Sequence, residues 1–417
     1  MIEKLDTKDS INTVKKPAVE DKFSFLNNKF FKKEFPVVTA LFKKEILPSL
    51  KNLFTPPQSR QNIFGLDIGT SSVKLIQIIQ TRAGLELANL WSEQLPFSQD
   101  PDANKGAVKE ALKKIISANN IKGRIVTSVG GGAVNIQAIK IPFMPEDEIA
   151  KALEWEAQEG LSIDLETTAM DYVVLGETEK SGTRQIEILL ITVPKAVVSE
   201  LVNTVSELGL IPHAFEPPPL AVIEAFGQDE LKAQGHVVGI LELGAGLTNF
   251  SIVVDGALRF TRNIPIASSG FTDDIAEYIN IDKLSAEKLK IKCGLTGFLA
   301  SAASLADTGD EAVRVAQAMN FKLEKLVSGI EHTFKFYLHQ LSSLNISNFD
   351  KLILSGGGAL IKDLDKFLSG RLNVPVTIAD PFKKVAVNEN KFNLGYLKEN
   401  APRFTLVVGL ALRKDGF

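Results

Sequence analysis

Hydrophobic and polar positions along the chain show first the alternation typical of β-strands and then the periodicity typical of helices. From Ile63, the short apolar runs FGLDIG, VKLIQIIQ and LELANLW have the length and residue types of β-strands. A helical pattern follows over residues 106–119, and RIVTSVGG is typical of a further strand. This order predicts an α/β domain that begins near Ile63.

The segment 142–216 shows a separate succession of helix and strand patterns. It contains a helical pattern (EDEIAKALEWEAQEGL), two strand patterns (MDYVVLGE and QIEILLITVP) and a second helical pattern (KAVVSELVNTVSELGL). We interpret it as a small inserted α+β subdomain within a first domain that spans residues 63–234.

The strand pattern of the start recurs after residue 235. The run VVGILELGAGLTNFSIVVDGALRF is followed by a long, mainly helical stretch to Leu344. This internal repeat predicts a duplicated architecture, with a second domain over residues 235–417.

The N-terminal part of the chain differs from both domains. Residues 1–21 are polar and aperiodic, which predicts a disordered tail. Residues 22–62 form a basic, Phe/Lys-rich extension that ends in the proline linker TPPQS. From Lys22 to Arg60 it holds eight Lys/Arg and two Glu, a charge of +6, with seven phenylalanines interleaved.

A helix over residues 38–53 would place Val38, Phe42, Ile46 and Leu50 on one stripe. Two interpretations of this stripe stay open. It can lie on an anionic membrane surface, or it can pack on the globular body or a partner. Pro48 kinks the helix in either case.

Composition excludes several classes of protein. The chain has 417 residues, 45% of them hydrophobic, with a net charge of -3 and a pI near 6.0. This charge gives no positive electrostatic field that would favour nucleic-acid binding. Cys293 is the single cysteine, which rules out an internal disulfide and predicts a reducing, cytoplasmic compartment. The longest apolar stretch, 235–254, is interrupted by Glu242 and Asn249, and the N-terminus lacks a signal-peptide pattern, so no membrane-crossing segment is expected.

The first candidate site is the hairpin FGLDIGTSSVK, residues 64–74. Gly69 allows a tight turn whose N–H groups face a phosphate. Asp67, at the strand end, can hold a hydrated Mg²⁺ through water, and Lys74 can reach a phosphate oxygen. The turn also supplies hydroxyl donors, from Thr70, Ser71 and Ser72.

A second hairpin, LELGAGLTNF at residues 241–250, repeats the order of strand, acid, glycine turn and strand. One such turn is weak evidence, because any hairpin can carry an acid and a glycine at its bend. Two copies about one domain apart predict a clamp that grips phosphates from opposite sides. The candidates here are Gly244, Ala245, Gly246 and Thr248 for phosphate, and Glu242 with Asp67 for the metal.

The third element, LILSGGGALI at residues 352–361, is an apolar strand, a triple glycine and an expected helix start. Gly356, Gly357 and Gly358 at such a junction would let a base and its ribose lie against the backbone, near a helix N-terminus. The order of hairpin, hairpin and glycine junction makes a ligand-free loop a poor interpretation.

These motifs, in this order, resemble the phosphate-1, phosphate-2 and adenosine motifs of the actin, sugar-kinase and heat-shock-chaperone superfamily. Within it, the chain is similar to the FtsA/PilM family over most of its length beyond residue 62. The resemblance implies an actin-like (ribonuclease H-like) fold with duplicated domains, and a C-terminal helix, VVGLA at 407–411, that returns to the first domain and crosses closely at Gly409.

The same resemblance assigns roles to three further residues. Glu216, which opens the connecting segment EPPPLAVIEAFG, is implied to orient the attacking water. Glu287 and Lys290, three apart in SAEKLK, are implied to hold the ribose of the nucleotide. The cofactors implied are ATP and Mg²⁺.

For partners, the resemblance implies the cytoplasmic N-terminal peptide of the membrane protein PilN, held in a groove that the insert helps to form, with nucleotide setting the shape of the groove. The protein would then be a type IV pilus assembly scaffold, cytoplasmic and peripheral at the inner membrane. The alternative is an FtsA-like tether of cell division that polymerises and uses residues 22–54 as its membrane anchor.

Two departures from the family pattern bear on activity. Glu242 stands where the superfamily usually has Asp, and Leu247 where a threonine is common. The longer carboxylate shifts the metal, so we expect nucleotide binding with slow hydrolysis at most. A metabolic kinase of this fold would need an Asp base in a sugar pocket, which the sequence lacks, and the few residues after Gly409 leave no room for a chaperone's substrate domain.

Overall fold

The computed structural model describes residues 63–96, 101–180, 182–227, 231, 236–299, 305–340 and 348–413. The predicted tail, the basic extension and the helix over 38–53 lie outside these residues. Those three predictions rest on the sequence alone.

A six-stranded sheet in the order β14-β3-β2-β1-β4-β8 forms the core of the first domain. β1, β2 and β3 pair as antiparallel neighbours, whereas β1, β4 and β8 are parallel. Phe64 and Leu66 pack under α3 and α5, as the apolar alternation predicts. The strands are β1 (Ile63–Ile68), β2 (Ser72–Thr81), β3 (Gly84–Gln94), β4 (Arg124–Ser128), β8 (Ile211–Glu216) and β14 (Val385–Ala386), and the helices on this face are α3 (Pro101–Asn119) and α5 (Lys195–Glu207).

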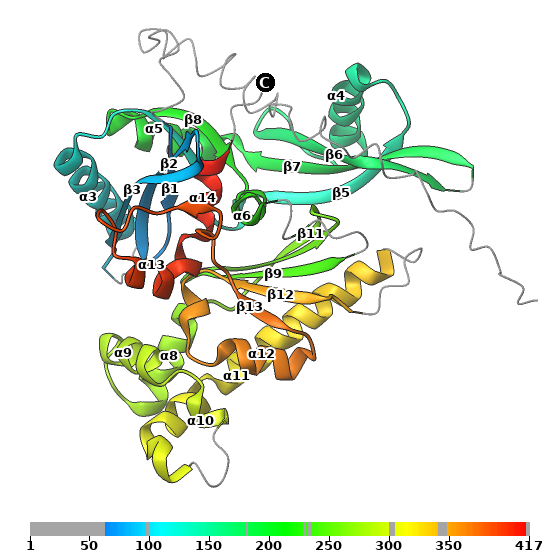
Figure 1. The fold of residues 1–417 in the computed structure, drawn as a ribbon. Helices are drawn as coiled ribbons and strands as arrows, with labels where there is room; N and C mark the ends of the chain where they lie inside the picture. The colour runs from blue at the N-terminus through cyan, green and yellow to red at the C-terminus, as the bar shows by residue number, and fades with distance from the viewer. Residues whose placement is uncertain are drawn as a thin grey trace, which may run out of the picture.

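The inserted subdomain is a three-stranded antiparallel sheet, in the order β5-β7-β6, with one helix on it (Figure 1). The helix packs Ile149 and Leu153 on the sheet and ends in a π-helical turn. The elements are β5 (Asn135–Pro142), α4 (Glu146–Trp155), the π turn (Glu156–Gly160), β6 (Thr168–Lys180) and β7 (Thr183–Pro194).

The bounds of this insert differ from the sequence-based range of 142–216. Its sheet begins with β5, which ends at Pro142, and finishes at Pro194. The helix and strand that follow, α5 and β8, belong to the first domain, because β8 pairs in parallel with β4. The helices and strands of an insert show the same hydrophobic patterns as those of its host domain. The boundary between them is set by which strands pair with each other, and the hydrophobic pattern does not reveal that pairing.

The second domain has a five-stranded sheet in the order β11-β10-β9-β12-β13. One face packs on a long helix, α11, and its neighbours, with Phe250 and Phe271 wholly buried between them. The strands are β9 (Val237–Leu243), β10 (Thr248–Val254), β11 (Ala257–Ile264), β12 (Lys351–Ser355) and β13 (Val376–Ile378), and the helices are α8 (Ser268–Ile279), α9 (Lys283–Cys293), α10 (Thr296–Leu299), α11 (Leu305–Gln340) and α12 (Leu364–Leu372).

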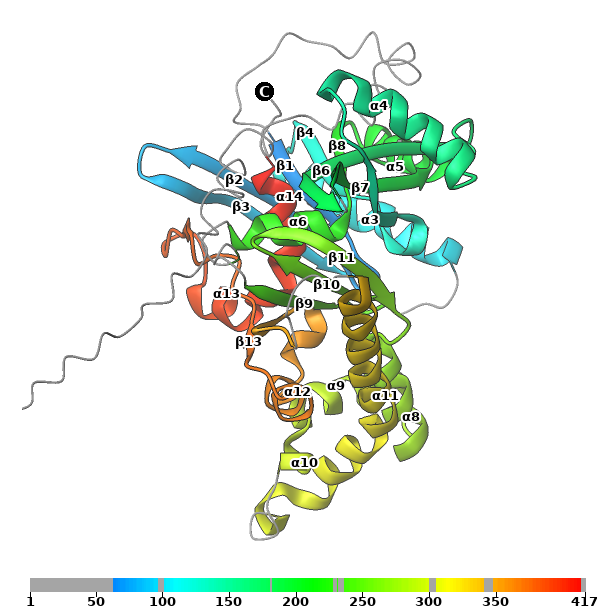
Figure 2. The same ribbon diagram turned by 90° about the vertical axis from the view of Figure 1, so that its right-hand side faces the viewer.

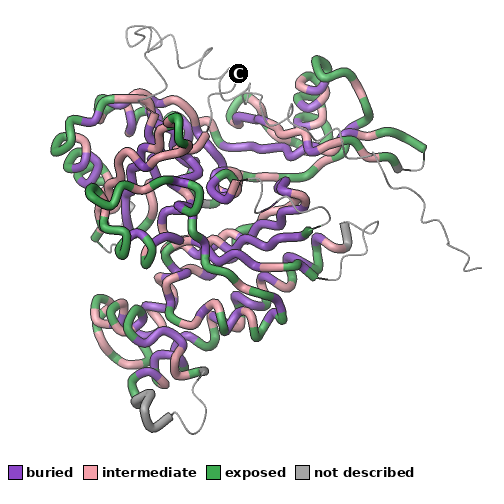
Figure 3. The backbone as a smooth tube through the Cα atoms, viewed as in Figure 1, coloured by how far each residue is buried: buried purple, intermediate pink, exposed green. Residues whose placement is uncertain are grey.

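Two helices, α6 (Pro218–Phe226) and α14 (Thr405–Leu412), lie between the two sheets (Figures 1 and 2). α6 packs Val222 and Phe226 on β9 and β10, while α14 packs Val407 and Val408 on the first sheet. α14 follows α13 (Leu394–Asn400) and a 3-10 turn (Ala401–Phe404). The C-terminal helix therefore returns to the first domain, and Figure 3 shows the buried backbone running through both sheets and this layer.

α6 and α14 cross at Gly409. A Cβ on Gly409 would lie 1.7 Å from the carbonyl oxygen of Ala221, which is far inside van der Waals contact. The close crossing expected from the sequence is therefore present, and only glycine fits it.

Within the described ranges, no helix is both long enough and apolar enough to cross a bilayer.

Candidate functional site

The turn between β1 and β2 presents its tip to the space between the domains. The N–H of Gly69 donates to the carbonyl of Ser72 at 3.0 Å, and the N–H of Leu95 donates to the carbonyl of Ser71 at 2.9 Å. Thr70 and Ser71 are exposed, whereas Ser72 is buried. The hairpin therefore offers two hydroxyls on a fixed turn, as a phosphate cradle needs.

Asp67 and Lys74 stand opposite each other on this hairpin and form a buried ion pair. Lys74 Nζ donates to Asp67 Oδ2 at 2.7 Å, and each side chain is about a tenth exposed. Both residues occupy strand positions that alternate with Leu66 and Val73, so they face the α14 layer and the second domain. The predicted metal carboxylate and phosphate lysine thus occupy one site.

The second hairpin turn is held by the helix that follows it. The N–H of Gly244 donates to the carbonyl of Leu247 at 3.0 Å. The first N–H groups of α8 donate to carbonyl oxygens of the turn: Ser268 donates to the carbonyl of Gly244 at 2.9 Å, and Ser269 donates to the carbonyl of Ala245 at 3.1 Å. Two of the N-terminal N–H groups that a helix leaves unpaired are thereby used to fix the turn.

The tips of the two hairpins meet across the domains. A Cβ on Gly246 would lie 2.4 Å from Thr70 Oγ1, so a side chain there would require Thr70 to move or the tips to separate. The two domains therefore approach each other most closely where a glycine on one tip faces a threonine side chain on the other.

Glu242 completes a charged cluster with Asp67 and Lys74. Burial, and then the nearby Asp67 carboxylate, raise the pKa of Glu242 to about 8, while Lys74 opposes the rise. Ser355 stands beside Glu242 in the register of β12 and β9, and its buried hydroxyl has no hydrogen-bond partner among the described residues. One ammonium does not balance two carboxylates, so a further cation would favour the ionised form of Glu242.

The glycine junction lies directly behind the second hairpin. Gly356 has φ of +84°, and its N–H donates to the carbonyl of Pro402 at 2.9 Å. A Cβ on Gly358 would lie 2.3 Å from the side chain of Leu243, whereas a Cβ on Gly357 would meet no atom within 4 Å. The helix expected right after the glycines is only a 3-10 turn (Gly357–Leu360), and α12 begins later, at Leu364.

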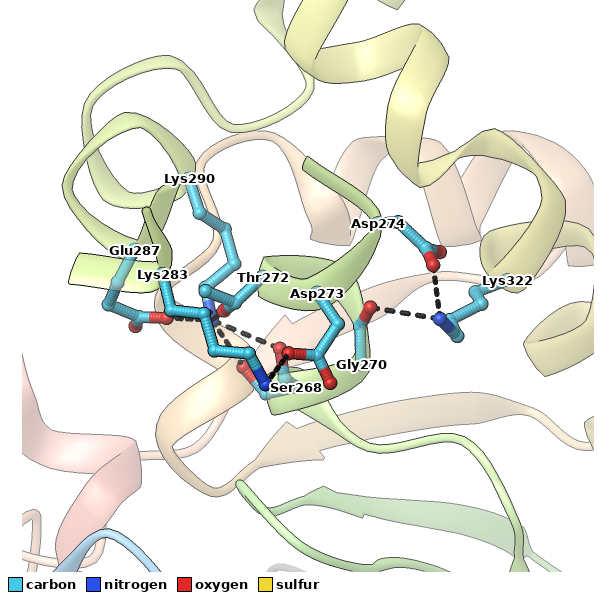
Figure 4. Close-up of polar contacts among 9 residues, drawn as sticks. All are labelled: Ser268, Gly270, Thr272, Asp273, Asp274, Lys283, Glu287, Lys290 and Lys322. Atoms are coloured by element: carbon cyan, nitrogen blue, oxygen red, sulfur yellow. Dashed lines mark hydrogen bonds and ion pairs between the residues drawn. The ribbon is translucent and has the colours of Figure 1, made fainter. Parts of the chain in front are cut away.

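Lys290 lies at the centre of a polar network between α8 and α9 (Figure 4). Its ammonium is buried and donates to the Ser268 carbonyl at 3.0 Å, to Thr272 Oγ1 at 2.8 Å and to Glu287, at an N–O distance of 2.7 Å. Burial lowers the pKa of Lys290, and the Glu287 carboxylate opposes that shift. Lys290 thus fastens α9 to the first turn of α8, the turn that holds Gly244.

The two residues implied to hold the ribose are therefore placed differently. Glu287 is 43% exposed and open to a ligand, whereas Lys290 is 4% exposed and already engaged within the protein. Two further ion pairs join α8 to its neighbours: Lys283 on α9 pairs with Asp273 at 2.6 Å, and Lys322 on α11 pairs with Asp274 (Figure 4).

Glu216 lies at the end of β8, on the same edge of the sheet as Asp67, and is buried. It forms an ion pair with Arg413, which follows α14. Burial raises the pKa of Glu216 to about 7, with Arg413 opposing and Glu224 adding to the rise. A role in orienting water would require this ion pair to open.

Sequence reasoning missed Arg413, Ser268, Thr272 and Ser355. Ser268 and Thr272 carried a signal, because Ser and Thr mark helix starts and ASSGFTDDI has that pattern. Arg413 carried none, since it pairs with Glu216, which lies far away in the chain.

The residues present fit a nucleoside triphosphate with Mg²⁺. The hairpin tips offer hydroxyls and glycines, the Ser355 hydroxyl is unpartnered beside Glu242, and Gly357 leaves room for a flat group. The described residues contain no group of three or more His, Cys, Asp or Glu that could hold a metal. Two carboxylates, with phosphate oxygens and water completing the shell, are the ligands that Mg²⁺ takes.

Comparison with known proteins gives one family. Residues 65–415 match the family model described as type IV pilus assembly protein PilM. Among solved structures, a chain of the PilM-PilN type IV pilus biogenesis complex is similar with a TM-score of 0.71 at 24% identity, over 85% of this chain and 99% of that one.

Among curated proteins, the chain is similar to cell division protein FtsA. FtsA of Neisseria meningitidis serogroup B is 23% identical over 387 residues, covering 85% of this chain and 90% of FtsA. FtsA of Bacillus subtilis is 24% identical over 388 residues, covering 84% and 85%.

Proposed function

The chain belongs to the family of the type IV pilus assembly protein PilM, and from this we propose that it is an ATP-binding scaffold of type IV pilus assembly. Its actin-like α/β fold, predicted from the sequence, is confirmed by the likeness to the PilM-PilN structure. In the proposal it works on the cytoplasmic side of the inner membrane, where it holds the N-terminal peptide of a PilN-like membrane protein.

The observation that carries the nucleotide part is the contact of the two hairpin tips at Gly246 and Thr70. A triphosphate between the tips would receive hydrogen bonds from both domains, while Asp67 and Glu242 would hold its Mg²⁺ through water. When bound, Mg²⁺ would neutralise phosphate charge. Because the tips touch, a ligand that enters there must change the spacing of the domains, and this is how nucleotide would set the shape of a distant groove.

Slow turnover is part of this proposal. Glu216, the candidate for orienting water, is paired with Arg413, and burial raises the pKa of Glu242, which disfavours its ionised form when no cation is bound. ATP would then act by binding and changing the conformation, more than by being hydrolysed.

The proposal is tested by the affinity of the PilN-like protein's N-terminal peptide, measured by calorimetry with and without Mg-ATP. We expect a five- to 150-fold change, the usual size of coupling between two sites. A Gly246→Val variant should bind the peptide with one affinity in both conditions, since its hairpins are held apart. Equal affinities for the wild type would disprove the coupling while leaving both binding events intact.

A second candidate is an FtsA-like tether that polymerises on the membrane, favoured by the FtsA relatives that match about 85% of this chain. Residues 22–54 would then be the membrane anchor. We expect the full chain to float with vesicles containing anionic lipid in low salt, and a chain that starts at Ile63 to stay behind. If both remain with the protein fraction, the tether is excluded and the PilN-bound scaffold stands.

A further inference from the structure

The inserted subdomain contacts the second domain as well as the first. β11, an edge strand of the second sheet, lies beside β5 of the insert (Figure 1). Apolar side chains from the insert and from β11 form one cluster here, bordered by two side chains of α6. Its members are Leu175 and Leu189 from the insert, Ala257 and Leu258 from β11, and Leu220 and Ile223 from α6. The insert is therefore attached to both domains.

An ion pair crosses this contact. Arg259 Nη1 on β11 donates to Glu187 Oε2 on β7 at 2.8 Å, and the two side chains are only 14% and 21% exposed. Arg184 and Glu177, which pair within the insert, are by contrast 57% and 46% exposed. Solvent and salt screen a half-buried pair less than an exposed one. The pair that joins the insert to the second domain is thus the better shielded of the two.

Arg259 occupies a β-bulge. Leu258 and Phe260 pair with consecutive residues of β10, so Arg259 is an extra residue between them. As a result, Leu258 packs toward the insert, whereas Phe260 packs against α11. A bulge bends a strand and redirects side chains, and this one turns the end of β11 toward the insert.

The insert has a bulge at the same contact. In β6, Leu175 is an extra residue beside Glu187 of β7. The next residue, Gly176, has φ of +148°, a conformation that favours glycine. Two bulges meet at one contact, one adding an apolar side chain and the other a charge. Because bulges are specific features of a sequence, this contact is more than a chance approach of two surfaces.

β10 connects this contact to the phosphate hairpins. Its first residue, Thr248, belongs to the second hairpin, and its last, Val254, precedes a two-residue turn into β11. Asp255 and Gly256 in that turn both have positive φ, as tight hairpin turns require. The strand has seven residues and spans about 20 Å. Since it is hydrogen-bonded to β9 and β11 along its length, a displacement of the hairpin tip moves β11 as well.

We propose that Arg259, Glu187 and the apolar cluster beside them form a latch that makes the insert follow the second domain when the spacing of the domains changes. This inference rests on the proposed function, because it names the residues that carry the nucleotide signal to the insert. With the latch closed, a change at the hairpin tips shifts the insert relative to the first sheet. With the latch open, the insert stays with the first domain, to which the chain joins it.

Reversing the charges of the latch tests it. The measured quantity is the coupling factor, which is the change that Mg-ATP causes in the affinity of the PilN-like protein's N-terminal peptide. We expect a coupling factor of about five to 150 in the wild type, and about two or less in Arg259→Glu, which sets two carboxylates against each other. Arg259→Glu/Glu187→Arg restores an ion pair and should recover most of the coupling.

Two further variants control this experiment. Arg184→Glu makes the same charge reversal in the exposed pair with Glu177, within the insert, and should keep the wild-type coupling. Arg259→Met removes the charge but keeps an apolar stem, so it tests the latch even where two facing carboxylates impair folding. It should also lower the coupling. All variants should still bind Mg-ATP, because none alters the hairpins.

A distance measurement follows the motion without the peptide. Spin labels at Asp147→Cys on α4 and Lys113→Cys on α3, both exposed positions, report where the insert lies relative to the first domain. Mg-ATP should shift this distance in the otherwise wild-type chain. The shift should be lost when Arg259→Met is added.

The outcomes separate the latch from the proposed function. Coupling that stays at the wild-type level in Arg259→Met, or that the double reversal fails to restore, overturns the latch and leaves the proposed function standing. A wild type without coupling overturns the coupled function, and the label distance then tests the latch separately. A shift with Mg-ATP that Arg259→Met abolishes supports the latch, and a distance that Mg-ATP leaves unchanged overturns it.

Discussion

Gly409→Val is expected to cost at least about 3 kcal/mol of unfolding free energy and to leave little folded protein at 37 °C. A Cβ at residue 409 would overlap the carbonyl of Ala221, and the atom it meets is backbone in the middle of α6, which has no rotamer through which to move. α6 and α14 are also the layer between both sheets, so separating them disturbs both domains. Urea unfolding followed by circular dichroism measures the loss.

The matched control for this variant is Gly106→Ala. Gly106 also lies within a helix, α3, but a Cβ there would meet nothing within 4 Å. The substitution should raise stability by about 0.5–1 kcal/mol, because alanine has the better helix propensity. Similar stabilities for the two variants would show that helix propensity, and not the crossing, decides the effect at residue 409.

Local patterns made much of the fold predictable from the sequence. The two hairpins and the glycine junction are contiguous motifs, so each could be found within ten residues or so, and their order indicated the fold. The crossing at Gly409 could be expected because VVGLA resembles the superfamily's second connecting helix, in which a glycine allows close crossing. The insert's start was misplaced because β5 differs from a host strand only in its partner, β7.

What the sequence could not show depends on long-range contacts. Asp67 and Glu242 were assigned to one metal. Nothing in the sequence pattern indicates that Lys74 forms an ion pair with Asp67 and lowers the pKa of Glu242. Lys290 was assigned to a ribose contact by the resemblance of SAEKLK to the family's segment, and its engagement with the first turn of α8 follows only from how α8 and α9 pack. Pairing across the chain, more than residue type, decides which side chains remain available to a ligand.

Asp67→Ala is expected to weaken Mg-ATP binding about a hundredfold or more, since it removes both a carboxylate for the metal and the partner of Lys74. It should also destabilise the nucleotide-free protein, because breaking a buried ion pair costs about 3–5 kcal/mol when the remaining charge has no other partner. Calorimetric titration and urea unfolding measure the two effects separately. Asp147→Ala removes an exposed carboxylate from the first turn of α4, in the inserted subdomain, and should leave Mg-ATP binding unchanged and lower stability by no more than about 1 kcal/mol.

Glu242 should recover part of that stability. Burial is the main cause that raises the pKa of Glu242 and the Asp67 carboxylate is the second, so removing Asp67 should lower that pKa and favour an ion pair between Glu242 and Lys74. The double variant Asp67→Ala/Glu242→Gln loses this rescue and should be less stable than Asp67→Ala alone, while Asp67→Leu/Lys74→Met, which replaces the whole pair with apolar groups, should fold at least as well as the wild type without binding nucleotide. If Asp67→Ala and Asp67→Ala/Glu242→Gln unfold at the same urea concentration, Glu242 does not pair with Lys74 when Asp67 is absent, and the three residues do not act as one cluster.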